Sequence, residues 1–256
     1  MKRIFGLFAD LALCLTFYTR LPIRWQGLEG RNFAEAQWAA PLAGVAVALC
    51  GAFIFWLGYT VGTPPLLTAA LTLTAILVVT GCLHEDGAAD VADGFGGGRT
   101  REHKLEIMRD SHHGTYGFAT LIVTFLIRWS AIAALATPWT ALGALLAAHA
   151  VSRALIPAFM IVLPPARRNG LSAGAGTPTW PIAGAALAIG AVFLLPALGV
   201  IGGPIAAAAL AAWFFFLKKL SLRQIGGQTG DVLGALQQGA EIIVLVIAAI
   251  LASELQ

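Results

Sequence analysis

The sequence predicts an all-α, polytopic integral membrane protein: a bundle of about seven transmembrane helices preceded by a short N-terminal helix. Hydrophobic residues make up 58% of the 256 residues, mean hydropathy is +0.81, and only 11% of the residues are charged. A soluble domain carries roughly 25% charged residues, and an apolar run of about 20 residues can cross a bilayer. Because no linker or polar domain interrupts this pattern, we expect residues 1–256 to form one membrane-embedded domain.

The first element is a helix over residues 4–19 that is too short to span a membrane. It imitates a signal peptide, since Lys2 and Arg3 precede an apolar stretch. Asp10 interrupts that stretch, however, and no small-residue cleavage site follows it. We therefore expect a retained helix that lies in the membrane interface or re-enters the membrane.

Seven longer apolar segments follow. Their small residues, as in AAPLAGVAVALCGA, allow helix backbones to approach closely. The cysteines Cys14, Cys50 and Cys82 lie within apolar stretches without CxxC spacing, which indicates packing rather than a disulfide or a thiolate metal site. The predicted spans are 36–60, 65–83, 115–136, 140–163, 178–198, 203–220 and 232–253.

Alternate loops are basic, which predicts the orientation of the bundle. No Lys or Arg occurs in the turns at 61–64, 137–139 and 199–203. Cytoplasmic loops carry the excess of Lys and Arg, so the basic loops and the polar motifs within them should face the cytoplasm. The dispersed charge also argues against nucleic-acid binding, although the net charge is +3. The loop residues that carry this pattern are Arg20, Arg24, Arg31, Arg99, Arg101, Lys104, Arg109, Arg167, Arg168, Lys218, Lys219 and Arg223.

Four carboxylates gather in HEDGAADVADGFGGG, residues 84–98. On a helix, Asp86, Asp90 and Asp93 follow an i, i+4, i+7 pattern and share about 60° of one face. Such close carboxylates repel one another unless a cation compensates them, and oxygen ligands suit Mg²⁺ or Mn²⁺. We predict a metal site on Asp86, Asp90 and Asp93, in which Asp86 and Asp90 are the main ligands and Glu85 is a flanking candidate. Asp93, beside Gly94, is the predicted general base for a hydroxyl nucleophile.

Two other interpretations remain open at this point. A solvated helix end would account for the acidity of the segment, but not for the shared face or the glycines. A cation-coupled or proton-coupled transporter would also carry carboxylates, yet these lie in a charged loop near the interface rather than at mid-membrane. The face loosely resembles the aspartate helix of CDP-alcohol phosphotransferases, so a related membrane phosphotransferase is the nearer alternative.

Basic residues downstream could bind phosphate. The segment RTREHKLEIMRDSHHGTYG, residues 99–117, places several Lys and Arg residues after the acidic face, and Arg suits bidentate phosphate contacts. Arg128 and Arg153 lie within predicted spans, where charged residues face the bundle interior. They should bind phosphate or neutralise Asp10 or Glu241. Asp231 begins the last span, with Thr229 as its expected N-cap.

Five motifs resemble the cobalamin synthase family in their order along the chain. They are FYTRLPI (17–23), HEDGAADVADG (84–94), LEIMRDSHHGTYG (105–117), ARRNGL (166–171) and GGQTGDVLGAL (226–236). His112 and His113 depart from the Arg-aliphatic pair expected for that family. Together with the residue-based arguments, the motifs single out a set of phosphate-binding and substrate-binding candidates: Arg20, Arg99, Arg101, Lys104, Arg109, Asp110, Arg153 and Asp231.

The resemblance implies an activity and a location. An enzyme of this family transfers the adenosylcobinamide-phosphoryl group from adenosylcobinamide-GDP to α-ribazole or its 5′-phosphate, and GMP leaves. The implied setting is a bacterial cytoplasmic (inner) membrane, with a multi-pass chain in the lipid bilayer, an active site that faces the cytoplasm and Mg²⁺ as cofactor. The sequence leaves open whether the chain forms a homo-oligomer.

Overall fold

The computed structural model describes residues 2–25, 28, 30–167 and 169–253, and it is all-α over these residues. They contain no strand and only an isolated bridge between Pro165 and Gln228, which confirms the predicted fold class. The helices are α1 (Lys2–Tyr18), α2 (Phe33–Ala36), the 3-10 turn η1 (Gln37–Ala39), α3 (Ala40–Thr60), α4 (Pro65–Thr80), α5 (Leu83–Gly97), α6 (Arg101–Ile107), α7 (Thr115–Ala133), α8 (Pro138–Val162), α9 (Leu171–Gly174), α10 (Trp180–Ile225) and α11 (Gly230–Ser253).

The long helices account for the predicted spans. Five described helical segments are apolar and long enough to cross a membrane, and a sixth is obtained if the bent pair α4 and α5 counts as one. The helix α10 is counted once but covers both predicted segments 178–198 and 203–220. Its backbone is non-helical at Gly199, with φ of 68°, so α10 consists of two helical segments joined at a kink. The seven predicted segments therefore correspond to helices of the structure.

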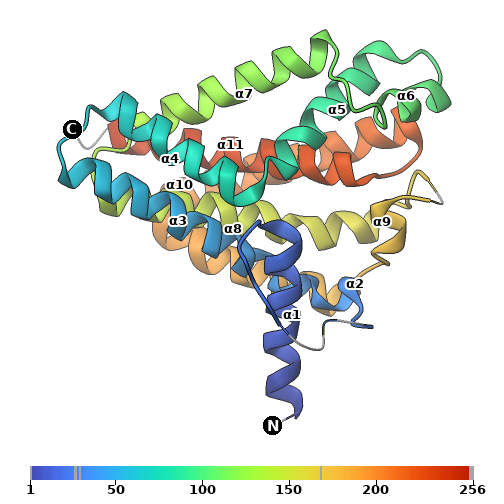
Figure 1. Ribbon diagram of the computed structural model, residues 1–256, viewed down its shortest axis with the longest axis horizontal. Helices are drawn as coiled ribbons and strands as arrows, with labels where there is room; N and C mark the ends of the chain where they lie inside the picture. Colours follow the sequence, from blue (N-terminus) through green and yellow to red (C-terminus); the bar gives the residue numbers. More distant parts are fainter. Residues whose placement is uncertain (1, 26–27, 29, 168, 254–256) are drawn as a thin grey trace.

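The N-terminal helix α1 runs across the long direction of the bundle rather than along it (Figure 1). Asp10, which interrupts its apolar sequence, forms an ion pair with Arg31 and accepts a hydrogen bond from Trp38 Nε1 at 3.1 Å. These partners lie in the segment that leads from α1 into α3. The short helix predicted over 4–19 is therefore present, and its polar residue is satisfied within the protein.

Helix α8 forms the centre of the bundle, because small residues let its neighbours approach closely. A Cβ atom at Gly44 of α3 would lie only 2.1 Å from the His149 carbonyl oxygen of α8. A Cβ atom at Gly190 of α10 would lie 2.8 Å from the Ala154 Cβ. Both approaches are possible only because glycine has no side chain. This confirms the close packing expected from the Ala-rich and Gly-rich helices.

The acidic helix α5 is separate from α4. Gly81 and Cys82 both adopt left-handed backbone conformations, with φ of 62° and 56°, and they turn the chain by 87° between the two helices. The predicted span 65–83 therefore ends at Thr80, and the acidic face lies on a helix of its own. The face itself survives, since residues 83–97 form one helix. Helices α5, α6 and α9 lie at one end of the bundle, opposite the C-terminal end (Figure 1).

Candidate active site

Asp86 and Asp90 lie one turn apart on α5, and His113 stands beside both. His113 Nε2 is 3.4 Å from Asp86 Oδ1, and its Nδ1 is 3.6 Å from Asp90 Oδ1. The side chain of Asp86 is 66% exposed, whereas that of Asp90 is 13% exposed. The structure thus brings together two of the three predicted carboxylates. His113 was missed, because a pair of adjacent histidines points to no regular metal site in a sequence.

Asp93 makes different contacts from the other two members of the face. Its Oδ2 accepts a hydrogen bond from the Gly114 amide at 2.7 Å, and its Oδ1 accepts one from the Gly117 amide at 2.9 Å. A Cβ atom at Gly117 would lie 2.3 Å from Asp93 Oδ2, so only glycine allows this approach. The carboxylate therefore caps the first turn of α7, where backbone amides lack helical partners and a negative charge is favoured.

Asp231 lies at the start of α11, where this helix crosses α5. Thr229 Oγ1 accepts a hydrogen bond from the Val232 amide at 3.3 Å, so it caps the helix as predicted, and it also donates to Asp231 Oδ2 at 3.1 Å. A Cβ atom at Gly87 would lie 2.9 Å from the Asp231 Cα. The glycine in HEDG therefore allows α5 to pack directly against the start of α11. Asp231 is consequently the neighbour of Asp86 on the adjoining helix.

Arg167 reaches this cluster through the pairing of two loops. The Ala166 amide donates to the Gln228 carbonyl at 2.8 Å, and the Gln228 amide donates to the Pro164 carbonyl at 2.9 Å. This pairing places Arg167 Nη2 3.5 Å from Asp231 Oδ2. The Arg167 side chain is 14% exposed, and its Nε and Nη2 lack hydrogen-bond partners within the described residues. In the sequence, Arg167 stands out only as a basic loop residue, although it lies within the ARRNGL motif. Its neighbour Arg168 lies outside the described residues.

Two of the predicted basic residues connect α6 to other loops. Arg101 Nη2 donates to the Ala166 carbonyl at 3.0 Å, and Lys104 Nζ donates to Gln224 Oε1. These contacts attach α6 to the loop that carries Arg167 and to the end of α10. The remaining basic candidates of this segment, Arg99 and Arg109, are exposed.

Arg20 and Asp110 lie at the edges of the region. The exposed Arg20 packs over the turn between α4 and α5, where a Cβ atom at Gly81 would lie 2.5 Å from Arg20 Nε. Asp110 accepts a hydrogen bond from the His112 amide at 3.0 Å and contacts His112 Nδ1 at 2.8 Å. The His112 side chain and amide hold the pKa of the Asp110 carboxyl below its usual range. Neither residue contacts Asp86 or Asp90 in the way that His113 does.

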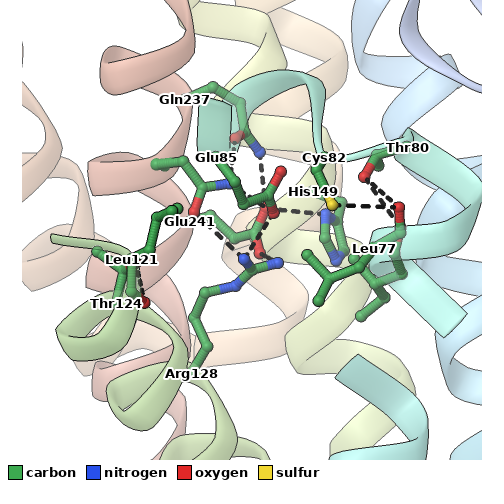
Figure 2. A network of polar contacts seen from close by, with 12 residues as sticks. Leu77, Thr80, Cys82, Glu85, Leu121, Thr124, Arg128, His149, Gln237 and Glu241 are labelled. Atoms are coloured by element: carbon green, nitrogen blue, oxygen red, sulfur yellow. Dashed lines mark hydrogen bonds and ion pairs between the residues drawn. The ribbon is translucent and has the colours of Figure 1, made fainter. Parts of the chain in front are cut away.

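Glu85 belongs to a buried ionic network rather than to the exposed acidic face. Arg128 Nη1 of α7 donates to Glu85 Oε1 at 2.7 Å, and Arg128 Nη2 lies 2.7 Å from Glu241 Oε1 of α11, as Figure 2 shows. Gln238 Nε2 also donates to Glu85 Oε1, at 3.1 Å. The negative charge of Glu85 is therefore compensated by protein groups. The proposal that Arg128 neutralises Glu241 agrees with this geometry.

Arg153 lies in the interior of the bundle, at 0% exposure. Its Nη1 donates to the His149 carbonyl at 3.1 Å, and His149 Nδ1 lies 3.1 Å from Glu241 Oε2. Arg153 thus joins the ionic network instead of the cluster around Asp86, and His149 is a buried histidine with a polar partner. A phosphate role for Arg153 remains a prediction.

The cluster fits a divalent cation only if a substrate completes its coordination. Within the described residues, no group of three or more His, Cys, Asp or Glu side chains is arranged to hold a metal ion. Asp86 and Asp90 still present two neighbouring carboxylates at an accessible surface. Mg²⁺ is commonly bound by one or two carboxylates together with waters and substrate phosphates, so these two residues suit that mode. Asp93 and Glu85 fit it less well, because amides and Arg128 already satisfy them.

Comparisons with known proteins agree over almost the whole chain. Residues 10–249 match the family described as cobalamin-5-phosphate synthase. The chain is 52% identical over 242 residues to adenosylcobinamide-GDP ribazoletransferase of Mesorhizobium japonicum. The matched residues cover 94% of this chain and 93% of that protein. The protein of the same name in Bradyrhizobium diazoefficiens is 48% identical over 249 residues, with 97% and 96% coverage. No solved structure matches the chain.

Proposed function

The chain belongs to the cobalamin-5-phosphate synthase family, and from this premise we propose how its acidic end performs the family's reaction. The enzyme is an adenosylcobinamide-GDP ribazoletransferase that closes the nucleotide loop of cobalamin. In our proposal, a ribose hydroxyl of α-ribazole or its 5′-phosphate attacks the phosphorus that carries cobinamide. A new P–O bond forms, the P–O bond to GMP breaks, and the hydroxyl proton passes to a protein carboxylate.

The observation that carries the proposal is the convergence of Asp86, Asp90, Asp231 and Arg167 from three parts of the chain. Asp86 and Asp90 would hold Mg²⁺, with Mn²⁺ as a substitute. A bound divalent cation would neutralise charge on the pyrophosphate and stabilise the leaving phosphate of GMP. Arg167 would bind a phosphate oxygen, since its Nε and Nη2 lack hydrogen-bond partners within the described residues and its charge is held at the site by Asp231.

We propose that Asp231, rather than Asp93, accepts the proton of the attacking hydroxyl. Both oxygens of Asp93 already accept hydrogen bonds from backbone amides, and the residue as a whole is 6% exposed. A base must lie within hydrogen-bond reach of the proton that it removes, which favours a more accessible carboxylate. Asp231 is 27% exposed, lies beside Arg167, and adjoins Gly87 of the metal-binding helix. In this account Asp93 positions His113 by fixing the start of α7.

The same arrangement indicates where the substrates approach. Arg99 and Arg109 are exposed at this end of the bundle and would attract the anionic donor. The basic loops of this end should face the cytoplasm of a bacterial inner membrane. Family membership disfavours both alternatives that the sequence left open, the CDP-alcohol-phosphotransferase-like enzyme and the cation-coupled transporter.

The experiment is a reaction of the purified protein in lipid with adenosylcobinamide-GDP, α-ribazole 5′-phosphate and Mg²⁺. We expect GMP and adenosylcobalamin 5′-phosphate to appear in equal amounts. The Asp231→Asn variant should lose at least about a hundredfold in maximal rate, the scale of losing a positioned catalytic group. Full activity of Asp231→Asn with an inactive Asp93→Asn of unchanged stability would reverse the assignment of the base.

A further inference from the structure

A cavity of about 150 Å³ adjoins the acidic site and shares Asp86 and Asp231 with it. An engineered apolar cavity of roughly this volume binds benzene, so a small aromatic ring system fits such a space. The cavity extends away from the two carboxylates toward the end of α1, which crosses the bundle here. Its other walls are largely apolar and include Phe17, Tyr18, Phe33, Ile156, Met160 and Leu233.

Aromatic side chains form one wall of the cavity. The ring centroids of Phe17 and Phe33 are 4.5 Å apart, and those of Phe17 and Tyr18 are 5.0 Å apart in an edge arrangement. Tyr18 is held in place because its hydroxyl donates to Gln37 Oε1 at 2.8 Å. A planar ligand could stack on these rings or contact their edges. Such aromatic contacts stabilise a complex beyond the burial of apolar area alone.

His84 lines the cavity, and one of its ring nitrogens lacks a partner among the residues that the structure describes. His84 is 3% exposed and stacks on Tyr18, with ring centroids 5.9 Å apart and an angle of 14° between the planes. Its Nε2 has no hydrogen-bond partner within the described residues. A buried polar atom left in this state is unfavourable, and most such atoms in proteins have a partner. His84 therefore brings an unused hydrogen-bonding group to the lining of the cavity.

We propose that the cavity binds the aromatic base of the nucleoside acceptor, an inference that rests on the proposed function. A benzimidazole base is planar and mostly apolar, and its unsubstituted ring nitrogen can accept a hydrogen bond from His84 Nε2. With the base in the cavity, the ribose is directed toward the shared carboxylates Asp86 and Asp231. The base thus occupies the apolar part and the reacting hydroxyl the acidic part.

The other substrate groups fit the cavity less well. Guanine carries several donors and acceptors along its edge, and unpaired polar groups weaken binding strongly. Away from the carboxylates, the uncharged polar side chains of the lining are His84, Ser172 and Tyr18, whose hydroxyl is already engaged by Gln37. The corrin ring is much larger than a cavity of about 150 Å³. The nucleoside base is therefore the occupant favoured by size and polarity.

The first experiment fills the cavity. Ala175 lines it and Ala173 does not, although both lie in or next to α9, so Ala175→Trp and Ala173→Trp form a matched pair. Equilibrium dialysis of α-ribazole against the lipid-reconstituted protein measures binding without turnover. We expect Ala175→Trp to weaken binding at least about tenfold, because the indole occupies the space of the base. Ala173→Trp should bind α-ribazole as the wild type does.

The second experiment tests the hydrogen bond without altering the shape of the wall. His84→Phe keeps a ring against Tyr18 but removes Nε2. It should bind α-ribazole roughly tenfold more weakly than the wild type, the scale of one hydrogen bond to a buried group. An α-ribazole analogue with CH in place of the free ring nitrogen should bind the wild type more weakly than α-ribazole does. It should bind the wild type and His84→Phe equally.

The outcomes separate this inference from the proposed function. Unchanged α-ribazole binding in Ala175→Trp would overturn the inference, even if the enzyme is active. A selective rise in the KM for adenosylcobinamide-GDP would also overturn it, because the cavity would then hold the donor. Loss of turnover in the wild type with normal binding of α-ribazole would instead contradict the proposed reaction and support the subsite.

Discussion

Asp93 Oδ2 accepts a hydrogen bond from the Gly114 amide at 2.7 Å, which ties the end of the acidic helix to the start of α7. The contact spans 21 residues of sequence and explains the glycines of the GTYG segment, which leave room for the carboxylate. It also places the preceding residue, His113, between Asp86 and Asp90. Asp93 thus affects the geometry around Asp86 and Asp90 indirectly, because it caps α7 and so positions His113.

We predict that Asp93→Asn lowers stability more than it lowers chemistry. An amide nitrogen cannot accept a hydrogen bond, so at least one of the Gly114 and Gly117 amides loses its partner. Leaving a buried group in this state costs about 1–3 kcal/mol. Thermal unfolding in detergent should therefore show a lower midpoint for this variant. An unchanged midpoint combined with a lost maximal rate would return Asp93 to the role of general base.

The buried network makes a prediction about charge balance. Arg128→Met leaves both Glu85 and Glu241 without their cation, and removing one partner of a buried pair costs roughly 3–5 kcal/mol. Glu85→Gln leaves Arg128 paired with Glu241 and should be much milder. Unfolding midpoints of the two variants in the same detergent check this order. Equal midpoints would show that the network contributes little to holding α5 against α7 and α11.

Arg167 should act on the donor. Arg167→Met removes the guanidinium but keeps a long apolar side chain, so we expect the KM for adenosylcobinamide-GDP to rise at least about tenfold, the effect of one charge-assisted hydrogen bond. Lys219→Met is the matched control, because it removes an exposed charge near the C-terminal end of α10. It should leave this KM unchanged. If both substitutions act alike, then only the overall charge of this end matters.

The orientation of the bundle can be tested by cysteine labelling. His103 in α6 and Ala136 in the turn before α8 are both exposed and lie on opposite sides of the predicted bundle. In a background without Cys50 and Cys82, a membrane-impermeant maleimide should label Ala136→Cys in intact cells. It should label His103→Cys only after the membrane is opened. The reverse pattern would place the acidic end outside the cytoplasm.

The sequence predicted the features that depend on periodicity along one segment. Apolar length located the spans, and the i, i+4, i+7 spacing placed Asp86 and Asp90 on one face of α5. Two consecutive left-handed residues, at Gly81 and Cys82, were not foreseen, because cysteine rarely adopts this conformation. The break nevertheless left the spacing of the face unchanged.

Contacts between distant segments could not be predicted in the same way. Glu85 differs from Asp86 by one position, yet it points to Arg128, 43 residues away. Arg167 reaches Asp231 only because the loops at 164–166 and 228 pair through their backbones. Such pairings depend on helix packing, for which a single sequence carries no spacing rule. The sequence therefore predicted which segments carry the polar side chains, but not which of these side chains meet.

The metal site on α5 is tested by the dependence of the rate on Mg²⁺ in the Asp86→Asn and Asp90→Asn variants. Formation of GMP from adenosylcobinamide-GDP is measured over a range of Mg²⁺ concentrations in lipid-reconstituted protein. If these carboxylates hold the cation, each variant should lose at least about a hundredfold in rate at the Mg²⁺ concentration that saturates the wild type, and excess Mg²⁺ should restore part of it. Wild-type rates and an unchanged Mg²⁺ requirement in both folded variants would contradict a metal site on α5.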